Sequence, residues 1–525
     1  MQSEEIEREI VELRELLSAL RSSSAKAEER NVALERENKI LREELAILKQ
    51  GLFGRRTERI DPGQLALFLK ADVASDVATS SPHTADASAS VSRPKPSPGH
   101  GRAAFPEHLP RDIVELDVPE AERICGECGK ALSAIGEDIT ERGHVVPARI
   151  VVRRYVKRKY ACPAGCCVKT APTPEGVIEG AKYEASVYAY IATAKYADHM
   201  PLHRLEGIFK RQGLAIPKQT MWDMLARTDE LVAQPVLRQA HKELLEEPVL
   251  HGDETPITMR LEDGPGSREG YAWGWRNLHG TGPSKVLIEF RISRSRDGPT
   301  EFLGDWTGTL ITDGYSGYDQ VVLQNGIVRA GCWAHARRKF KQALDAGSRS
   351  AARVLVVIQR LFAVERAMAQ RAERRGLDRE AFVALRSRVR ERHGARLVKQ
   401  IFEAAQALSV ERATLPKSPL GKALVYLDRQ RGPLSAFLTD PRIPIHNNDE
   451  ERDLRQVAMG RNNWQTLGSE RGGQVACRMY SLVLSCKQAG VDPQAYIEDV
   501  LGRISTTKAA DIATLTPWAW AAARK

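Results

Sequence analysis

Apolar residues near the start of the chain recur at the a and d positions of a heptad, a pattern typical of a coiled coil. One row of this seam contains Leu34, Leu41 and Leu48. A polar Asn38 at an a position favours a two-stranded assembly at some cost in stability. We therefore predict that residues 4–56 form a self-associating, leucine zipper-like coiled coil. A single amphipathic helix packed on its own chain is the alternative.

Helical periodicity returns over residues 184–245, after a segment that cannot bury a core. That segment, residues 71–104, is rich in Ala, Ser, Pro and Asp, so we predict a disordered linker. Within 184–245, two helices flanking Gly213 could form a DNA-binding helix-turn-helix. Lys218 and Gln219 would then be exposed on its second helix, whereas an ordinary helical hairpin is the alternative.

Short apolar runs typical of strands begin at residue 247. Their order is three strands, a short helix, a strand, a helix and a strand, which predicts a ribonuclease H-like sheet. In such a sheet the first and fourth strands are neighbours. The predicted strands cover 248–253, 271–275, 285–292, 309–313 and 327–333.

Long helical stretches follow the predicted sheet. We assign residues 247–475 to a ribonuclease H-like catalytic domain with a helical insertion at about 341–440, and residues 476–525 to a C-terminal helical segment. Arginines of the insertion could contact DNA phosphates or form a solvated helix face. The predicted fold class is therefore multidomain α+β, with an N-terminal coiled coil and a small zinc-binding module.

Three acidic residues suit a two-metal phosphoryl-transfer site. Asp253 and Asp313 each end an apolar run, and Glu451 lies in a helical stretch after an Asn-Asn pair. Because the first and fourth strands are neighbours, the two aspartates should converge. Glu450 competes with Glu451 for the catalytic role, and a capping box with Asn448 as N-cap is the structural alternative for Glu451.

Five of the eight cysteines lie between Cys125 and Cys167. Cys125 and Cys128 form a CxxC knuckle of the kind that tetrahedral Zn²⁺ favours. Cys162 pairs with either Cys166 or Cys167, so the fourth ligand stays open. We predict one Zn²⁺ in a module spanning residues 120–170, with a metal-free cysteine-rich loop as the alternative.

Composition narrows the class of protein. The 525 residues are too many for one core, and the formal net charge of +10 points modestly to a polyanionic partner. No apolar run approaches the roughly 20 residues of a membrane span, and the acidic N-terminus lacks a signal-peptide pattern. We expect a cytoplasmic protein without membrane contact.

Six motifs occur in register along the chain: HGDETP, TDGYSGY, GCWAHARRKF, NNDEERDLR, GRNNW and GSERGG. Together they resemble the IS-sixty-six family of bacterial insertion-sequence transposases over nearly the whole chain. The resemblance implies a DDE-type DNA transposase whose catalytic acids are Asp253, Asp313 and Glu451. It also makes His335, in the Cys332–His335 segment, a neighbour of the site.

The resemblance implies a polynucleotidyl transferase that cuts and joins double-stranded DNA at the ends of its element. In this hypothesis Asp253 bridges two Mg²⁺ or Mn²⁺ ions, and Asp313 and Glu451 each hold one. An inactive transposase-derived DNA-binding protein and a metal-dependent nuclease without strand transfer are the alternatives. At least a homodimer is expected, and accessory transposition proteins are potential partners. Candidate DNA phosphate contacts are Arg452, Arg455, Arg461 and Arg471.

Overall fold

A computed structural model of the chain describes the larger part of its residues. The described residues are 26, 28–46, 106–107, 110–114, 117, 123, 127, 130, 139–142, 150–161, 166–171, 181–261, 264–280, 282–411 and 414–524. They belong to two units, one of Met1–Ala78 with Tyr155–Lys525 and one of Thr79–Arg154. The predicted linker at 71–104 and the predicted ligands Cys125, Cys128 and Cys162 lie outside the described residues.

The part of the predicted coiled coil that the structure describes is helical over residues 28–46. Three leucines of the predicted seam in this helix, Leu34, Leu41 and Leu45, are about half exposed. Exposed apolar side chains at a and d positions are available to a partner helix, so self-association stays a prediction. Within the described ranges, every helix is too short or too polar to cross a membrane.

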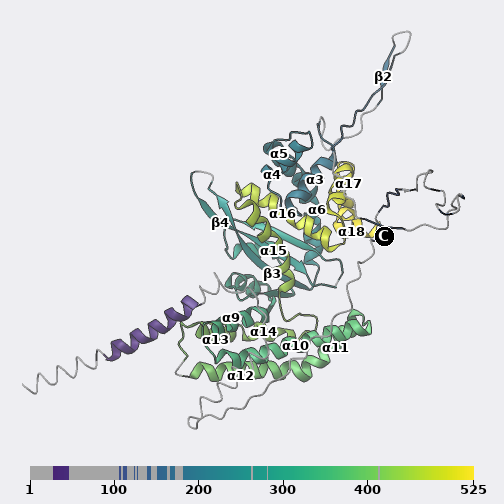
Figure 1. The fold of residues 1–525 in the computed structure, drawn as a ribbon. Coiled ribbons are helices and arrows are strands. Elements are labelled where there is room, and N and C mark those ends of the chain that lie inside the picture. Colours follow the sequence, from purple (N-terminus) through teal and green to yellow (C-terminus); the bar gives the residue numbers. More distant parts are fainter. Residues whose placement is uncertain are drawn as a thin grey trace, which may run out of the picture. The chain divides into compact units, whose positions relative to one another are not determined.

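A five-stranded sheet lies at the centre of the larger unit, with strand order β5-β4-β3-β6-β7 (Figure 1). Strands β3, β4 and β5 form an antiparallel meander, whereas β6 and β7 run parallel to β3. The first and fourth predicted strands, β3 and β6, are indeed neighbours, and the predicted mixture of helices and sheet is confirmed. The bounds are β3 Val249–Arg260, β4 Ser267–Asn277, β5 Val286–Arg291, β6 Thr309–Thr312 and β7 Val328–Gly331.

Strand β3 is longer than the sequence predicted, and Asp253 lies inside it instead of at its end. The parallel pairing with β6 stops at His251, while the antiparallel pairing with β4 continues to Arg260. Beyond His251, one edge of β3 is therefore open until Leu467 pairs beside Met259. Pro256 lies along this open edge, where its missing N–H removes no ladder hydrogen bond.

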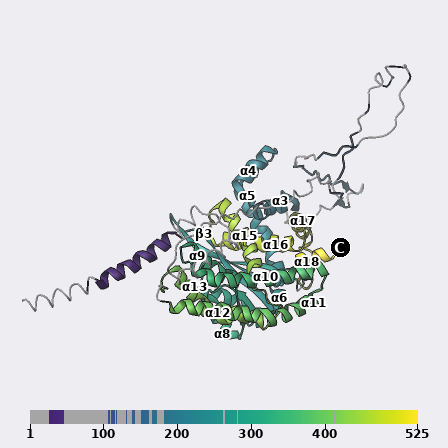
Figure 2. The ribbon, with the colours of Figure 1, turned by 60° about the horizontal axis from the view of Figure 1, so that its bottom comes forward.

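One face of the sheet is covered by the helical insertion. Val249, Ile311 and Ala330 belong to the same buried core as α9 and the insertion helices. Figure 2 shows these helices in front of the strands. They are α9 Trp333–Asp345, α10 Ala351–Arg375, α11 Arg379–Val389, α12 Ala395–Val410, α13 Pro419–Arg429 and α14 Arg431–Ser435.

Aromatic side chains fill the opposite face. Trp275 stacks on Phe302 of α7 with ring centroids 4.4 Å apart, and Trp273 meets the edge of Tyr318. These large rings bury apolar area and fix the loop that follows β6. The elements on this side include α7 Asp297–Leu303, the short 3-10 helix Ser316–Tyr318 and α8 Asp319–Asn325.

Helix α16, Glu470–Gln488, protects the outer edge of the sheet. The hydroxyl groups of Ser481 and Ser485 exchange hydrogen bonds with the backbone of Ile288 and Val286 on β5. This pairing satisfies backbone groups that would otherwise be exposed at an edge strand. The neighbouring helices are α3 Ala185–Tyr196, α4 Leu202–Arg211, α5 Lys218–Thr228, α6 Gln234–Leu245, α15 Asn448–Trp464, α17 Pro493–Arg503 and α18 Pro517–Ala522.

A small antiparallel hairpin precedes these helices. Its strands are β1, Lys159–Ala161, and β2, Val168–Thr170. Cys166 and Cys167, the two described members of the predicted zinc set, are exposed. Exposed thiols beside a short hairpin are compatible with metal binding, and the zinc site stays a prediction.

Candidate active site

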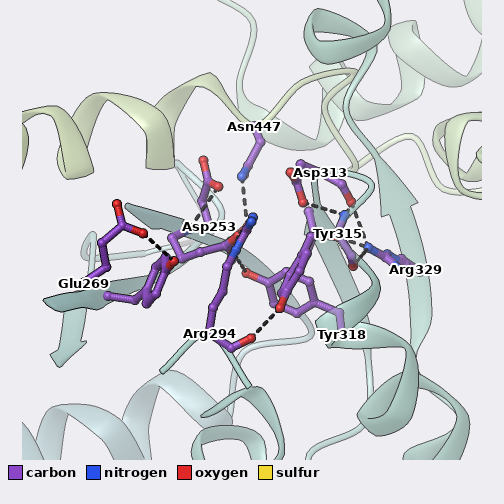
Figure 3. Close-up of polar contacts among 12 residues, drawn as sticks. Asp253, Glu269, Arg294, Asp313, Tyr315, Tyr318, Arg329 and Asn447 are labelled. Atoms are coloured by element: carbon purple, nitrogen blue, oxygen red, sulfur yellow. Dashed lines mark hydrogen bonds and ion pairs between the residues drawn. The ribbon is translucent and has the colours of Figure 1, made fainter. Parts of the chain in front are cut away.

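The two predicted aspartates lie where the parallel strands end. Asp253 is placed on β3 next to the last residue pairs shared with β6, and Asp313 directly follows β6. Carboxyl ends of parallel strands meet at one edge of a sheet, which is where such sheets form binding sites. Figure 3 shows both aspartates in this region together with Asn447. The structure therefore brings Asp253 and Asp313 into one neighbourhood.

The electrostatics of Asp253 link all three predicted acids. Burial raises the pKa of Asp253 well above its usual range, and the like charges of Glu254, Asp313 and Glu451 raise it further. One backbone hydrogen bond, from the Glu254 N–H to Asp253 Oδ1 at 2.9 Å, acts in the opposite direction. A cluster of carboxylates whose charges oppose one another is stabilised by a bound cation.

Glu451 reaches the same region from the first turn of α15. Its Oε1 is buried, has no hydrogen-bond partner in the described part of the chain, and lies 3.8 Å from His335 Nδ1. Its Oε2 accepts a hydrogen bond of 3.3 Å from Arg338 on α9. The capping-box alternative is wrong, because α15 begins at Asn448 and its N-cap is Asn447, whose side chain makes no capping hydrogen bond. The side chain of Glu451 is thus free to serve the site.

His335 lies beside the predicted acids, as expected. It follows Cys332, the residue before α9, and the Cys332 thiol, the His335 ring and the Glu451 carboxylate have ligand atoms within 4.8 Å of one another. Burial lowers the pKa of His335, whereas the charge of Glu451 raises it. An imidazole in this position can orient Glu451 or exchange a proton with a nearby group.

Asn447, which sequence reasoning did not select, fixes α15 to the sheet. It is fully buried. Its Nδ2 donates to the Gly252 carbonyl at 3.0 Å, its Oδ1 lies 2.6 Å from His251 Nδ1, and its backbone N–H donates to Cys332 Sγ at 3.3 Å. Burial lowers the pKa of His251 to about 4, so the ring is neutral at pH 7 and donates. Asn447 thereby joins the segments that carry Asp253, His335 and Glu451.

Glu450, the competing acid, has a different environment from Glu451. It is fully buried, and neither carboxylate oxygen has a hydrogen-bond partner among the described residues. Burial first, and then the charge of Asp453, raise the pKa of Glu450 well above its usual range. A carboxyl packed between its helix and the sheet is poorly placed to hold a cation from solution. This geometry favours Glu451 as the ligand.

Gly274 allows α15 to lie this close to the sheet. Gly274 pairs with Asp253, and a Cβ at Gly274 would lie 1.9 Å from Glu450 Oε1 and 3.0 Å from Leu454 Cδ2. We expect Gly274→Ala to lower the free energy of unfolding by about 1–3 kcal/mol, as overpacking does. Urea denaturation measures this loss.

A double-mutant cycle provides the control for Gly274→Ala. Glu450→Ala removes the atoms that the new methyl group would meet, so it should cost much less in the Gly274→Ala background than alone. Strictly additive losses would show that the methyl group does not meet Glu450.

A second acid in the HGDETP motif, Glu254, already forms an ion pair. Glu254 points toward the aromatic face, where it forms an ion pair with Arg294 and accepts a hydrogen bond of 3.0 Å from Tyr318. The guanidinium of Arg294 also stacks 3.9 Å from the centroid of the Tyr315 ring (Figure 3). Glu254 therefore supports the loop after β6, where both tyrosines pack.

The four arginines predicted to contact DNA differ in their exposure and in the contacts they already make. Arg461 donates to the Thr255 hydroxyl at 3.1 Å and to the Pro256 carbonyl, so it fills the open edge of β3. Arg471 is paired with Glu230 at 3.0 Å but remains 65% exposed. Arg452 pairs with Asp449 on its own helix and is 67% exposed, and Arg455 is exposed. Arg452 and Arg455 best fit a phosphate-binding surface.

Helices α4 and α5 match the predicted helical pair. They are joined by residues 212–217, with Gly213 at a φ of 86° in the connecting turn. Lys218 is the exposed first residue of α5, and Gln219 donates to Asp223 on the same helix at 3.0 Å. Whether this pair reads DNA stays a prediction.

Comparison with protein-family models gives matches over four parts of the chain. The Transposase IS66 family matches residues 180–475, and the IS66 C-terminal element matches 481–518. The Transposase C of IS166 homeodomain matches residues 40–114, and the zinc-finger binding domain of transposase IS66 matches 122–167. The first match alone spans more than half of the chain.

Two similar proteins come from Sinorhizobium fredii. The uncharacterized protein y4jD is 31% identical over 511 residues, which cover 92% of this chain and 94% of that protein. The uncharacterized protein y4qI is 31% identical over 444 residues, which cover 81% and 78%. This chain therefore belongs to the Transposase IS66 family, as the six motifs predicted.

Proposed function

We propose that this protein is a DNA transposase that cuts the ends of an insertion sequence and joins them to target DNA. The observation that carries the proposal is the approach of Asp253, Asp313 and Glu451 from a strand, a strand end and a helix. The family membership supports the transposase class. The sheet order, with an antiparallel meander followed by two parallel strands, supports a ribonuclease H-like catalytic domain over residues 247–475, with the insertion at about 341–440.

Asp253, Asp313 and Glu451 fit divalent cations. Carboxylate oxygens are the donors that Mg²⁺ and Mn²⁺ prefer. A bound cation would interact with Glu451 Oε1, and it would offset the like charges that raise the pKa of Asp253. Asp253, Asp313 and Glu451 would together hold these ions. When bound, two such ions supply activation of the attacking oxygen and stabilisation of the leaving oxygen.

The chain's own residues prepare this site for DNA. Asn447 sets the position of α15, and Arg338 holds Glu451 Oε2 until a cation competes for it. His335 is placed to orient Glu451. We further propose that Arg452 and Arg455 contact phosphates, since they extend from the same helix into solvent.

The remaining parts are proposed to bind DNA and to assemble copies of the chain. The homeodomain and zinc-finger matches support DNA binding by the N-terminal half. We propose one Zn²⁺ held by Cys125, Cys128, Cys162 and either Cys166 or Cys167. The exposed seam of the helix at 28–46 supports at least a dimer.

A strand-transfer assay tests the proposal. The full chain is incubated with Mg²⁺, a supercoiled target plasmid and a labelled duplex of the DNA that flanks its gene. We expect cleavage at the ends of inverted repeats, followed by labelled product joined to the plasmid. Cleavage without joining would instead indicate a nuclease, and binding without cleavage would indicate an inactive DNA-binding protein.

A further inference from the structure

A cavity lies at the far end of α15 from Glu451. Its volume is about 490 Å³, and it lies between that helix end and helices α3, α4 and α5. The basic residues Lys195, Arg204 and Lys218 contribute to its wall together with Trp464. Trp464 is the last residue of the GRNNW motif and has no part in the proposed catalytic site.

A second, smaller cavity of about 130 Å³ adjoins the first and shares Lys195, Leu202 and Trp464 with it. Its lining is mostly aromatic and apolar and includes Tyr196 and Trp222. The two cavities together place aromatic side chains beside three basic residues. A planar heterocycle attached to a phosphate has this distribution of chemistry.

Lys195 forms no ion pair with any residue that the structure describes. Its Nζ lies 6.0 Å from the centroid of the Trp464 ring. Burial lowers the pKa of Lys195 to about 8, and no carboxylate of the described residues offsets that effect. A partly buried ammonium group beside a cavity gains from an incoming anion. The neighbouring cations Arg204 and Lys218 are exposed at the entrance, which adds to the attraction.

Helix α15 spans the distance between the acids and this cavity, with Glu451 in its first turn and Trp464 as its last residue. Arg452, Arg455, Met459 and Asn462 are all exposed and recur every three or four residues, so they lie on one side of the helix. From Glu451 to Trp464 the helix rises about 20 Å at 1.5 Å per residue. A DNA strand with about 3.4 Å per nucleotide would cover that distance in roughly six steps.

We propose that this cavity binds an unstacked nucleotide of the DNA strand that runs along α15, with the base against Trp464 and its phosphate beside Lys195, Arg204 and Lys218. The inference rests on the proposed DNA-processing function and adds a second contact point to it. The nucleotide is either extruded from a duplex or part of a single-stranded end. Extrusion costs unstacking, which stacking on an aromatic ring offsets.

Fluorescence of 2-aminopurine tests this proposal with the full chain. The probes are a 25-base-pair duplex with one unpaired 2-aminopurine, the fully paired duplex, and the labelled single strand. We expect the protein to quench the fluorescence of an unpaired 2-aminopurine, and to bind the probe that carries it more tightly than the fully paired duplex. Whichever of the bulged and single-stranded probes binds more tightly identifies the source of the nucleotide.

The variants separate stacking from charge. Trp464→Ala should weaken binding of the unpaired probe by about 10- to 100-fold, and Trp464→Phe should restore most of it.

The double variant Arg204→Ala/Lys218→Ala changes only exposed side chains, so folding is retained. It should reduce the slope of log affinity against log salt by about 2. Lys210→Ala, an exposed basic residue of α4 outside the cavity, is the matched control and should leave the quenching unchanged.

Equal affinity and equal fluorescence for paired and unpaired probes, with strand transfer intact, would overturn the nucleotide site and leave the proposed function standing. Unchanged discrimination by Trp464→Ala would overturn it as well. Absence of binding to every probe would contradict the proposed function and this inference together.

Discussion

Asp253→Asn is expected to lower metal-dependent DNA strand cleavage by on the order of 10³-fold or more, as removal of a group acting on the reacting atoms does. The amide keeps the size of the side chain but removes the charge that would hold both cations. DNA binding should be retained, because the exposed basic side chains of α15 are unchanged. Cleavage rates and gel-shift affinities, measured on the same DNA, check both parts.

The Asp253→Asn variant should fold at least as stably as the wild type when divalent cations are absent. Burial and three like-charged neighbours raise the pKa of Asp253, so a neutral side chain relieves repulsion in the folded state. Asp297→Asn, at an exposed position of α7, is the matched control and should cleave normally. Full metal-dependent cleavage by Asp253→Asn would refute the assignment.

Glu451→Gln and Glu450→Gln are expected to differ sharply although the residues are adjacent. Glu451→Gln removes a charged ligand, and we expect a loss of cleavage of on the order of 10²–10³-fold or more. Glu450→Gln replaces a buried carboxyl, whose pKa burial raises, with a neutral group of the same shape, so cleavage should stay within about tenfold of wild type.

Each variant is a control for the other, because Glu450→Gln and Glu451→Gln both alter one residue in the first turn of α15. Thermal unfolding of both variants shows whether α15 still packs on β3 and β4. If Glu450→Gln lost cleavage while Glu451→Gln retained it, the two roles would have to be exchanged.

Sequence pattern predicted the sheet well because its strands are apolar runs with clear ends. The run before Asp313 ends at Thr312, and the neighbouring positions of β3 and β6 followed from the order of elements. The length of β3 could not be predicted in the same way. Pro256 normally argues against a strand, and only the open edge beyond His251 makes it acceptable.

The acids were predictable from motif and spacing, but their supporting residues were not. Asn447 and Gly274 are ordinary residues in the sequence; their roles depend on α15 lying against β3 and β4. Arg461 looked like a phosphate contact from its charge, yet it completes the edge of β3. The contrast between Glu450 and Glu451 also required knowledge of which side of α15 faces the sheet.

The most direct measurement for the central claim is uptake of Mn²⁺ by the full chain with bound DNA, followed by electron paramagnetic resonance. If Asp253, Asp313 and Glu451 share divalent cations, the wild type should bind Mn²⁺ that the triple variant Asp253→Asn/Asp313→Asn/Glu451→Gln does not bind. Excess Mg²⁺ should displace this Mn²⁺ from the wild type. Equal Mn²⁺ uptake by the wild type and the triple variant would contradict the account.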